Sequence, residues 1–209
     1  MRISPLVLLT LIFTSLLAQA NDSVIAEVQA LLQAGKPDEA LNAVAKLDAP
    51  AKGQPLVQHL TGLAHYQKGD YQQAVEFLTP SFAQTPIGSS QRIQAAHLLG
   101  MSHYFLGHIA QALPFLSEIA GSSLDTPETQ YLRGVCQLQA QQVDEARITF
   151  SRMFSVPADS AASRLINAQM MVRQQLEELA VDELQKALAL DPKLPQARFL
   201  LGELAIYKS

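Results

Sequence analysis

Apolar residues along this chain recur at intervals of three and four, which is the period of an amphipathic helix. One such run includes Leu60, Leu63 and Ala64, and the next includes Ala74 and Leu78. No stretch shows the strict alternation of apolar and polar residues that is typical of a half-buried strand. The pattern therefore predicts an all-α chain built from helices of about thirteen residues.

Turn and capping residues divide these helices into pairs. Glycines fall between the two helices of a pair, where a left-handed turn residue is favoured: Gly35, Gly69 and Gly107. Carboxylates stand at the start of second helices, where they meet the positive end of the helix dipole: Asp38, Glu39, Asp144 and Glu145. Prolines stand at the start of first helices, where a missing N–H costs least: Pro55, Pro127 and Pro195. This punctuation predicts a series of helix-turn-helix repeats.

Small residues mark the same period, which is roughly 34 residues. Alanines occupy one phase of it: Ala40, Ala74, Ala112, Ala146 and Ala180. Four of these alanines follow another small residue by twelve positions: Gly62, Gly100, Gly134 and Ala168. Two helix backbones approach closely only where both side chains are small, so each pair predicts a close helix crossing within one repeat.

The period sets a register for the whole chain after residue 20. We expect five full repeats and one half repeat, with an insertion of four residues near Ile87 to Arg92: 21–54, 55–88, 93–126, 127–160, 161–194 and 195–209. The segments HLTGLAHYQKGDYQQAVEFL at 59–78 and HLLGMSHYFLGHIAQALPFL at 97–116 are identical at half of their positions. Internal repetition at this period predicts a solenoid of stacked repeats.

The second repeat combines small, aromatic, turn and proline positions: Gly62, Tyr66, Gly69, Ala74, Leu78, Ser81 and Pro86. The third repeat matches at Gly100, Tyr104, Gly107, Ala112, Leu116 and Ile119. With these residues the chain resembles the tetratricopeptide repeat (TPR) family, over about nine tenths of its length. Tryptophan is absent, Val28 holds a small position, and Gln174 and Gln175 stand where a turn glycine is expected. The resemblance implies a right-handed α-solenoid of about five and a half repeats.

In that family the first helices line a concave face, and positions 2, 5, 9, 12 and 13 of each repeat look into the groove. The resemblance therefore implies these peptide- or protein-binding residues: His59, Leu63, Tyr66, Gln67, His97, Met101, Tyr104, Phe105, Tyr131, Val135, Leu138 and Gln139. The stripe is aromatic and apolar, which suits an extended or helical peptide with apolar anchors. The alternative is that several of these side chains pack between repeats. The Lys, Asn and Arg residues of a clamp for a carboxyl terminus are missing from positions 5, 9 and 13 of the first four repeats.

Residues 1–20 have the three parts of a secretory signal peptide. Arg2 gives a basic start, an apolar run extends from Leu6 to Leu17, and Ala18-Gln19-Ala20 suits cleavage. The run is shorter than the roughly 20 residues of a membrane span. We expect cleavage before Asn21 and a periplasmic or secreted protein without stable membrane insertion. Retention of the segment as an anchor is the alternative.

Charge and cysteine content exclude several classes of function. The formal net charge is −4, and removal of Arg2 brings it to about −5. Lys and Arg form no basic patch, so we expect no nucleic-acid partner, because phosphate neutralisation needs clustered cations. The single cysteine, Cys136, cannot form an internal disulfide. Its place on the inner face of a first helix predicts a buried structural thiol rather than a reactive one.

The histidines and potential catalytic residues do not form a recognisable site. His59 and His65 are six residues apart, as are His97 and His103, so the members of each pair point to different faces of a helix. A helical zinc pair needs a spacing of four. No nucleophile elbow, phosphate loop, paired-carboxylate site or cofactor fingerprint occurs. We expect no metal, no cofactor and no enzymatic activity.

The half repeat at the end of the chain has no second helix to pack against its first. Gly202 holds the close-packing position, and Phe199, Leu204 and Ile206 are available for burial, whereas a terminal cap presents a polar outer face. We expect the chain to be a fragment of a longer protein. The alternatives are self-association through 195–209 and an imperfect cap.

These features together predict a non-enzymatic exported scaffold that binds a peptide or protein in its concave groove. Two alternatives stay open, because one solenoid fold serves many complexes. The chain could be the amino-terminal docking region of a larger exported enzyme, or a subunit of an envelope assembly or export complex.

Overall fold

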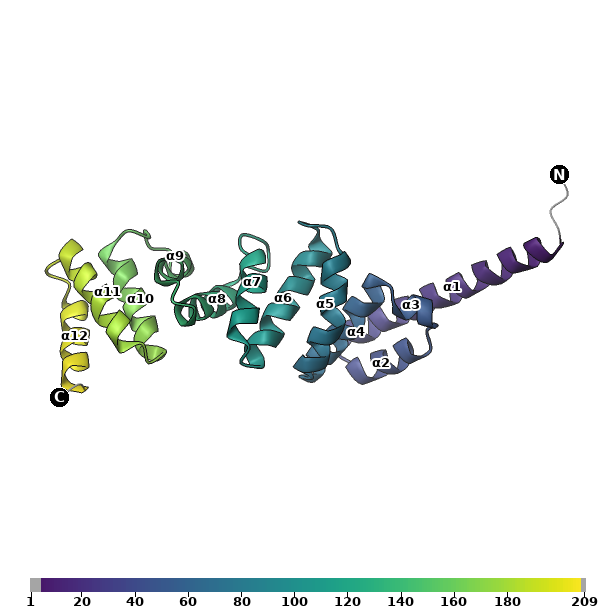
Figure 1. The fold of residues 1–209 in the computed structure, drawn as a ribbon, viewed down its shortest axis with the longest axis horizontal. Helices are drawn as coiled ribbons and strands as arrows, with labels where there is room; N and C mark the ends of the chain where they lie inside the picture. The colour runs from purple at the N-terminus through teal and green to yellow at the C-terminus, as the bar shows by residue number, and fades with distance from the viewer. Residues whose placement is uncertain (1–4, 208–209) are drawn as a thin grey trace. The chain divides into compact units, whose positions relative to one another are not determined.

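The computed structural model of the chain describes the backbone of residues 5–207 and the side chains of residues 19–206. Between residues 5 and 207 it contains twelve helices and no strand (Figure 1). Their bounds are α1 Pro5–Gln33, α2 Pro37–Ala45, α3 Ala49–Lys52, α4 Pro55–Lys68, α5 Tyr71–Gln84, α6 Ser90–Phe105, α7 Ile109–Glu118, α8 Pro127–Gln139, α9 Val143–Met153, α10 Ala161–Arg173, α11 Glu177–Leu190 and α12 Pro195–Tyr207. The prediction of an all-α chain is confirmed.

The helices form two compact halves, Met1–Gly107 and His108–Ser209. In the N-terminal half, α4 packs against α5, α1 packs against α2, and α1, α4 and α6 contact one another in succession. In the C-terminal half, α8 packs against α9 and α10 against α11, and α12 packs against α11. Helices that are neighbours in the sequence are therefore neighbours in space within each half, as in a solenoid of helix pairs.

The small residues lie where the helices of a pair cross. All five alanines of the predicted phase are fully buried: Ala40, Ala74, Ala112, Ala146 and Ala180. A Cβ atom added to Gly62 would lie 2.5 Å from Cγ of Leu78, and one added to Gly134 would lie 2.5 Å from the ring of Phe150. These distances leave no room for a side chain, so the predicted close crossings of α4 with α5 and of α8 with α9 are confirmed.

The turns between paired helices use the left-handed backbone conformation. Gly69 has φ of 80°, and the two N–H groups that follow α4 donate to the carbonyl oxygens of Tyr66 and His65. Later in the chain, Gln141 and Gln175 adopt the same conformation, with φ of 61° and 59°. The turn at Gln175 therefore keeps its shape although the expected glycine is missing.

Helix starts follow the repeat register except in the first repeat, where α1 begins before residue 21, and at the insertion. Four helices begin at the first residue of a predicted repeat: Pro55, Pro127, Ala161 and Pro195. The helix α6 begins earlier, at Ser90, and the hydroxyl of Ser89 caps it by accepting a hydrogen bond of 3.2 Å from the N–H of Arg92. The inserted residues thus form a turn at Gly88, with φ of 77°, and an additional turn of helix.

The predicted signal peptide falls partly outside the described residues. Residues 1–4 lie outside them, and residues 5–20 belong to α1, which continues without a break to Gln33. In the part of the chain that the structure describes, none of the helices combines the length and the apolar character that a membrane crossing requires.

A buried ion pair holds the loop between α7 and α8. Nη1 of Arg133 lies 2.8 Å from Oδ1 of Asp125 and donates to the carbonyl oxygen of Leu116 at 3.2 Å. Only 4% of the Arg133 side chain and 10% of the Asp125 side chain are exposed. Burial alone would raise the pKa of Asp125, but the hydrogen bond from the Gly121 N–H and the charge of Arg133 outweigh it and hold this pKa below its ordinary value.

Candidate binding groove

A groove of about 530 Å³ opens between α1, α4 and α6, the first helices of the first three repeats. Four leucines form its apolar part: Leu32, Leu56, Leu60 and Leu63. Five glutamines add amide groups, and one histidine and one serine complete it: Gln29, Gln33, Gln67, Gln91, Gln94, His59 and Ser90. The groove lies wholly within the N-terminal half.

The structure separates the predicted groove residues of this half into two sets. His59, Leu63 and Gln67 line the groove, whereas Tyr66, Tyr104 and Phe105 do not. The three aromatic residues instead join Tyr71 in a row of rings at the ends of α4 and α6. Ring centroids are 5.7 Å apart for Tyr66 and Tyr71, 4.7 Å for Tyr71 and Phe105, and 6.0 Å for Tyr104 and Phe105. The remaining two predictions, His97 and Met101, are half-buried outside the groove.

The aromatic row, which consists of Tyr66, Tyr71, Tyr104 and Phe105, is partly packed between helices and partly exposed. Tyr66 is half-buried, and Tyr71 of α5 lies between it and Phe105 of α6. Burial raises the pKa of Tyr66, with a smaller contribution from Tyr71. Phe105 is 49% exposed, so this end of the row still offers an apolar surface.

Two of the four residues predicted in the C-terminal half are wrong as groove residues, whereas Gln139 is exposed. Val135 and Leu138 are each only 1% exposed and belong to the core. The reason is that the segment of α8 that contains these residues is buried on every side of the helix. Every residue from Arg133 to Leu138 is buried, and six consecutive residues cover more than one turn of a helix. Tyr131 is half-buried, and its ring lies 6.4 Å from that of Phe150.

The predicted set lacks five lining residues that the repeat register marks. Gln29, Leu32 and Gln33 hold positions 9, 12 and 13 of the first repeat, and Leu56 and Gln94 hold position 2 of the second and third. The groove positions, extended to every repeat, identify all five. Gln91 precedes the third repeat, within the insertion, so no register could identify it.

The groove is electrically neutral. None of its lining residues is Asp, Glu, Lys or Arg. Burial lowers the pKa of His59, so its ring is uncharged near neutral pH. Nε2 of Gln67 donates to the carbonyl oxygen of Leu32 at 3.2 Å and ties α4 to α1. Two other polar atoms of the lining residues, Nδ1 of His59 and Nε2 of Gln91, are buried without a hydrogen-bond partner among the described residues.

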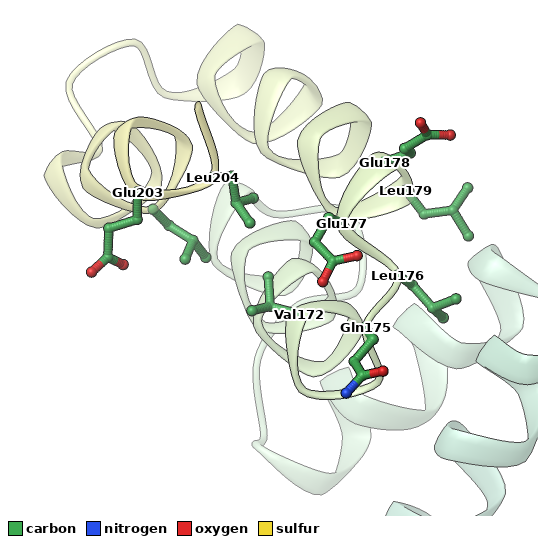
Figure 2. Close-up of a pocket in the computed structure, with 9 residues that line it drawn as sticks. Val172, Gln175, Leu176, Glu177, Glu178, Leu179, Glu203 and Leu204 are labelled. Atoms are coloured by element: carbon green, nitrogen blue, oxygen red, sulfur yellow. The ribbon is translucent and has the colours of Figure 1, made fainter. Parts of the chain in front are cut away.

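A second cavity, of about 880 Å³, lies between α10, α11 and α12 (Figure 2). Its apolar lining consists of Val172, Leu176, Leu179, Leu200 and Leu204. Three carboxylates also line it, but Figure 2 shows Glu178 and Glu203 on opposite sides with their carboxylates directed away from each other. These two carboxylates therefore do not converge on a common point where a cation or a reacting group could be held.

Among the described residues, no three His, Cys, Asp or Glu side chains are grouped so that they could hold a metal ion. The thiol of Cys136 is fully buried, as predicted, and burial raises its pKa to about 11. A thiol of this kind is a poor nucleophile, because the thiolate is the reactive form.

Sequence comparison decides the family. The family model described as "Tetratricopeptide repeat" matches residues 25–79 and 97–165, which together exceed half of the chain. The chain belongs to the tetratricopeptide repeat family. No curated protein matches it. The family explains the paired helices, the buried small residues and the position of the groove on first helices.

Solved TPR structures show the same fold. MamA from strain MSR-1 is 21% identical with a TM-score of 0.58, and the alignment covers 83% of this chain and 98% of that one. MamA from Desulfovibrio magneticus RS-1 is 20% identical, with a TM-score of 0.57 and coverage of 83% and 96%. YrrB, described as a TPR protein with an unusual peptide-binding site, is 17% identical, with a TM-score of 0.60 and coverage of 88% and 96%. These likenesses establish the α-solenoid fold of the chain.

Proposed function

We propose that this TPR protein is a non-enzymatic scaffold that binds a peptide segment of a partner protein in the groove between α1, α4 and α6. One observation carries the proposal. Eight of the eleven lining residues stand at the repeat positions that the family directs into its groove: Gln29, Leu32, Gln33, Leu56, His59, Leu63, Gln67 and Gln94. The cavity between α1, α4 and α6 thus coincides with the groove positions of the repeat pattern.

The chemistry of the groove supports binding rather than catalysis. When a ligand covers the apolar side chains of the groove, the free energy of the complex falls by about 25 cal/mol for each Å² of apolar surface removed from water. Leu56 is 38% exposed in the free protein and offers such a surface. Convergent polar groups beside an apolar floor are the usual composition of a ligand site. The description of YrrB as a protein with a peptide-binding site is in keeping with this use of the fold.

We also propose that the scaffold is exported. The support is the composition of residues 1–20, with a basic start, an apolar run and small residues before Asn21. Mass spectrometry of the protein recovered from its native cell would test this, since cleavage predicts a mature chain that starts at Asn21. An intact Met1 or Arg2 at the amino terminus would contradict it.

The binding proposal is tested with a random peptide library displayed on phage. We expect selection on the purified chain to enrich peptides whose affinity falls about tenfold or more in the variant Leu56→Glu, because a carboxylate then occupies the apolar floor. Leu56 lies in the first turn of α4, where a carboxylate suits the helix dipole, so the variant should still fold.

The matched control is Ala83→Glu, which introduces the same group at an exposed residue of α5 outside the groove. The control should bind the selected peptides as the original chain does. Equal affinity of all three proteins would contradict the groove proposal, as would the absence of any enriched peptide.

A further inference from the structure

Resting on the proposed groove function, we infer that the partner segment is an extended, uncharged stretch of peptide that the groove holds largely through its backbone. The occupant is thus a neutral segment of a partner protein rather than a charged tail or a preformed helix. Three features of the groove carry this inference: its amide groups, its lack of charge and its unsatisfied buried atoms.

The glutamine amides come from all three helices that form the groove. Gln29 and Gln33 belong to α1, Gln67 to α4, and Gln91 and Gln94 to α6. Each amide has donors and an acceptor, which is the combination that a peptide backbone also presents. A helical ligand has already paired its N–H and C=O groups internally, whereas an extended one leaves them free. Amides on both sides of an apolar floor therefore suit an extended backbone.

The absence of charge selects against charged ligand side chains. A Lys, Arg, Asp or Glu that entered this groove would lose hydration and meet no opposite charge, since no acidic or basic residue lines it. The ring of His59 is neutral near pH 7 because burial lowers its pKa, so it does not change this balance. Small or apolar side chains can instead lie on Leu56 and Leu63.

Two buried polar atoms of the lining residues have hydrogen-bonding capacity that no other described residue meets. Nδ1 of His59 and Nε2 of Gln91 are buried without partners among the described residues. Leaving such groups unpaired costs free energy. A ligand backbone that draws the Gln91 amide toward the groove would satisfy it, and this favours a polar backbone over a purely apolar surface.

The test uses the random phage-displayed library described above. We expect the enriched peptides to be depleted in Asp, Glu, Lys and Arg relative to the input. The affinity of the best neutral peptide should change by less than about twofold between about 50 and about 500 mM NaCl, because screening acts only on charges. N-methylation of its alternate backbone amides should weaken binding by about tenfold or more.

Protein variants separate backbone recognition from packing. Gln94→Leu keeps the groove neutral and removes an amide, so we expect about a tenfold loss of affinity for the unmethylated peptide. Gln72→Leu, at an exposed residue of α5 outside the groove, is the control and should leave the affinity unchanged. Gln94→Lys should shift the enriched peptides toward acidic sequences.

The outcomes distinguish this inference from the groove function on which it rests. Enrichment of charged peptides, strong salt dependence or tolerance of N-methylation, combined with sensitivity to Leu56→Glu, would overturn the neutral extended ligand and leave the groove in place. Insensitivity to Leu56→Glu would overturn the groove function itself.

Discussion

At the scale of single residues, the packing around a turn determines its backbone conformation more strongly than the residue type does. The turns after α8 and α10 adopt the left-handed conformation at Gln141 and Gln175, although a residue with a Cβ atom is strained there. The sequence pattern identified the place of the second turn, although Gln174 and Gln175 stand there instead of the expected glycine. The flanking helix crossings hold the turn closed, so tertiary packing overrides the local preference.

Replacing Gln175 by glycine should therefore stabilise the protein. We expect the free energy of unfolding to rise by about 1 kcal/mol, because the strain at positive φ disappears. Urea unfolding followed by circular dichroism measures this change. Its neighbour Gln174 has φ of −96° and provides the control, so Gln174→Gly should bring no gain. A gain for Gln174→Gly equal to that for Gln175→Gly would contradict this account of the turn.

The ion pair between Asp125 and Arg133 gives a second prediction at this scale. Asp125→Asn leaves Arg133 buried without its counter-charge and should lower the free energy of unfolding by on the order of 3 kcal/mol. The control is Asp159→Asn, whose carboxylate is fully exposed and lies 3.6 Å from Arg147, and this change should leave the unfolding midpoint in place.

The effect of Asp125→Asn should also depend on pH. Because the folded protein holds the pKa of Asp125 below its ordinary value of 3.8, the unfolded chain takes up the proton first as the pH falls. The stabilising contribution is therefore complete above the unfolded pKa and is lost as the pH drops through the folded one. A stability difference between the original chain and the variant that persists unchanged into strong acid would contradict this.

At the scale of helices, steric fit explains which predictions succeeded. The pairing of Gly62 with Ala74 and of Gly134 with Ala146 predicted the crossings, because close approach of two backbones leaves no alternative to small residues. The burial of Val135 and Leu138 could not be predicted in the same way. It depends on how many neighbours surround α8, and a periodic pattern within one helix carries no information on that number.

The helix crossings predict that replacing glycine by alanine lowers the stability of the protein at Gly62 and Gly134 but not at Gly202. Gly62→Ala and Gly134→Ala would each place a Cβ atom 2.5 Å from a buried side chain, so we expect losses of about 1 to 3 kcal/mol in the free energy of unfolding. Gly202→Ala on α12 meets nothing within 4 Å. It should be neutral or stabilising by up to about 1 kcal/mol, since alanine favours a helix. Thermal unfolding of the three variants compares them directly, and equal losses would contradict the packing described.

At the scale of the whole molecule, the repeat register predicted the fold well and the groove only in part. Together with the family resemblance it assigned the groove to first helices and included His59 and Leu63 among the groove residues. It did not separate groove residues from the aromatic row, because Tyr71 comes from a second helix that the groove positions do not consider. It also missed Gln91, because the insertion before α6 breaks the register. Contacts between repeats, rather than positions within one repeat, determine which of these side chains line the groove.

The central claim is that a peptide binds between α1, α4 and α6. Photochemical cross-linking tests it most directly, with an enriched library peptide that carries a benzophenone group at its centre and with mass spectrometry to locate the cross-links. The account predicts cross-links on α1, α4 and α6, at or beside Gln29, Leu56 and Gln94. Cross-links that fall instead on α2 and α5, or on α8 to α12, would contradict it.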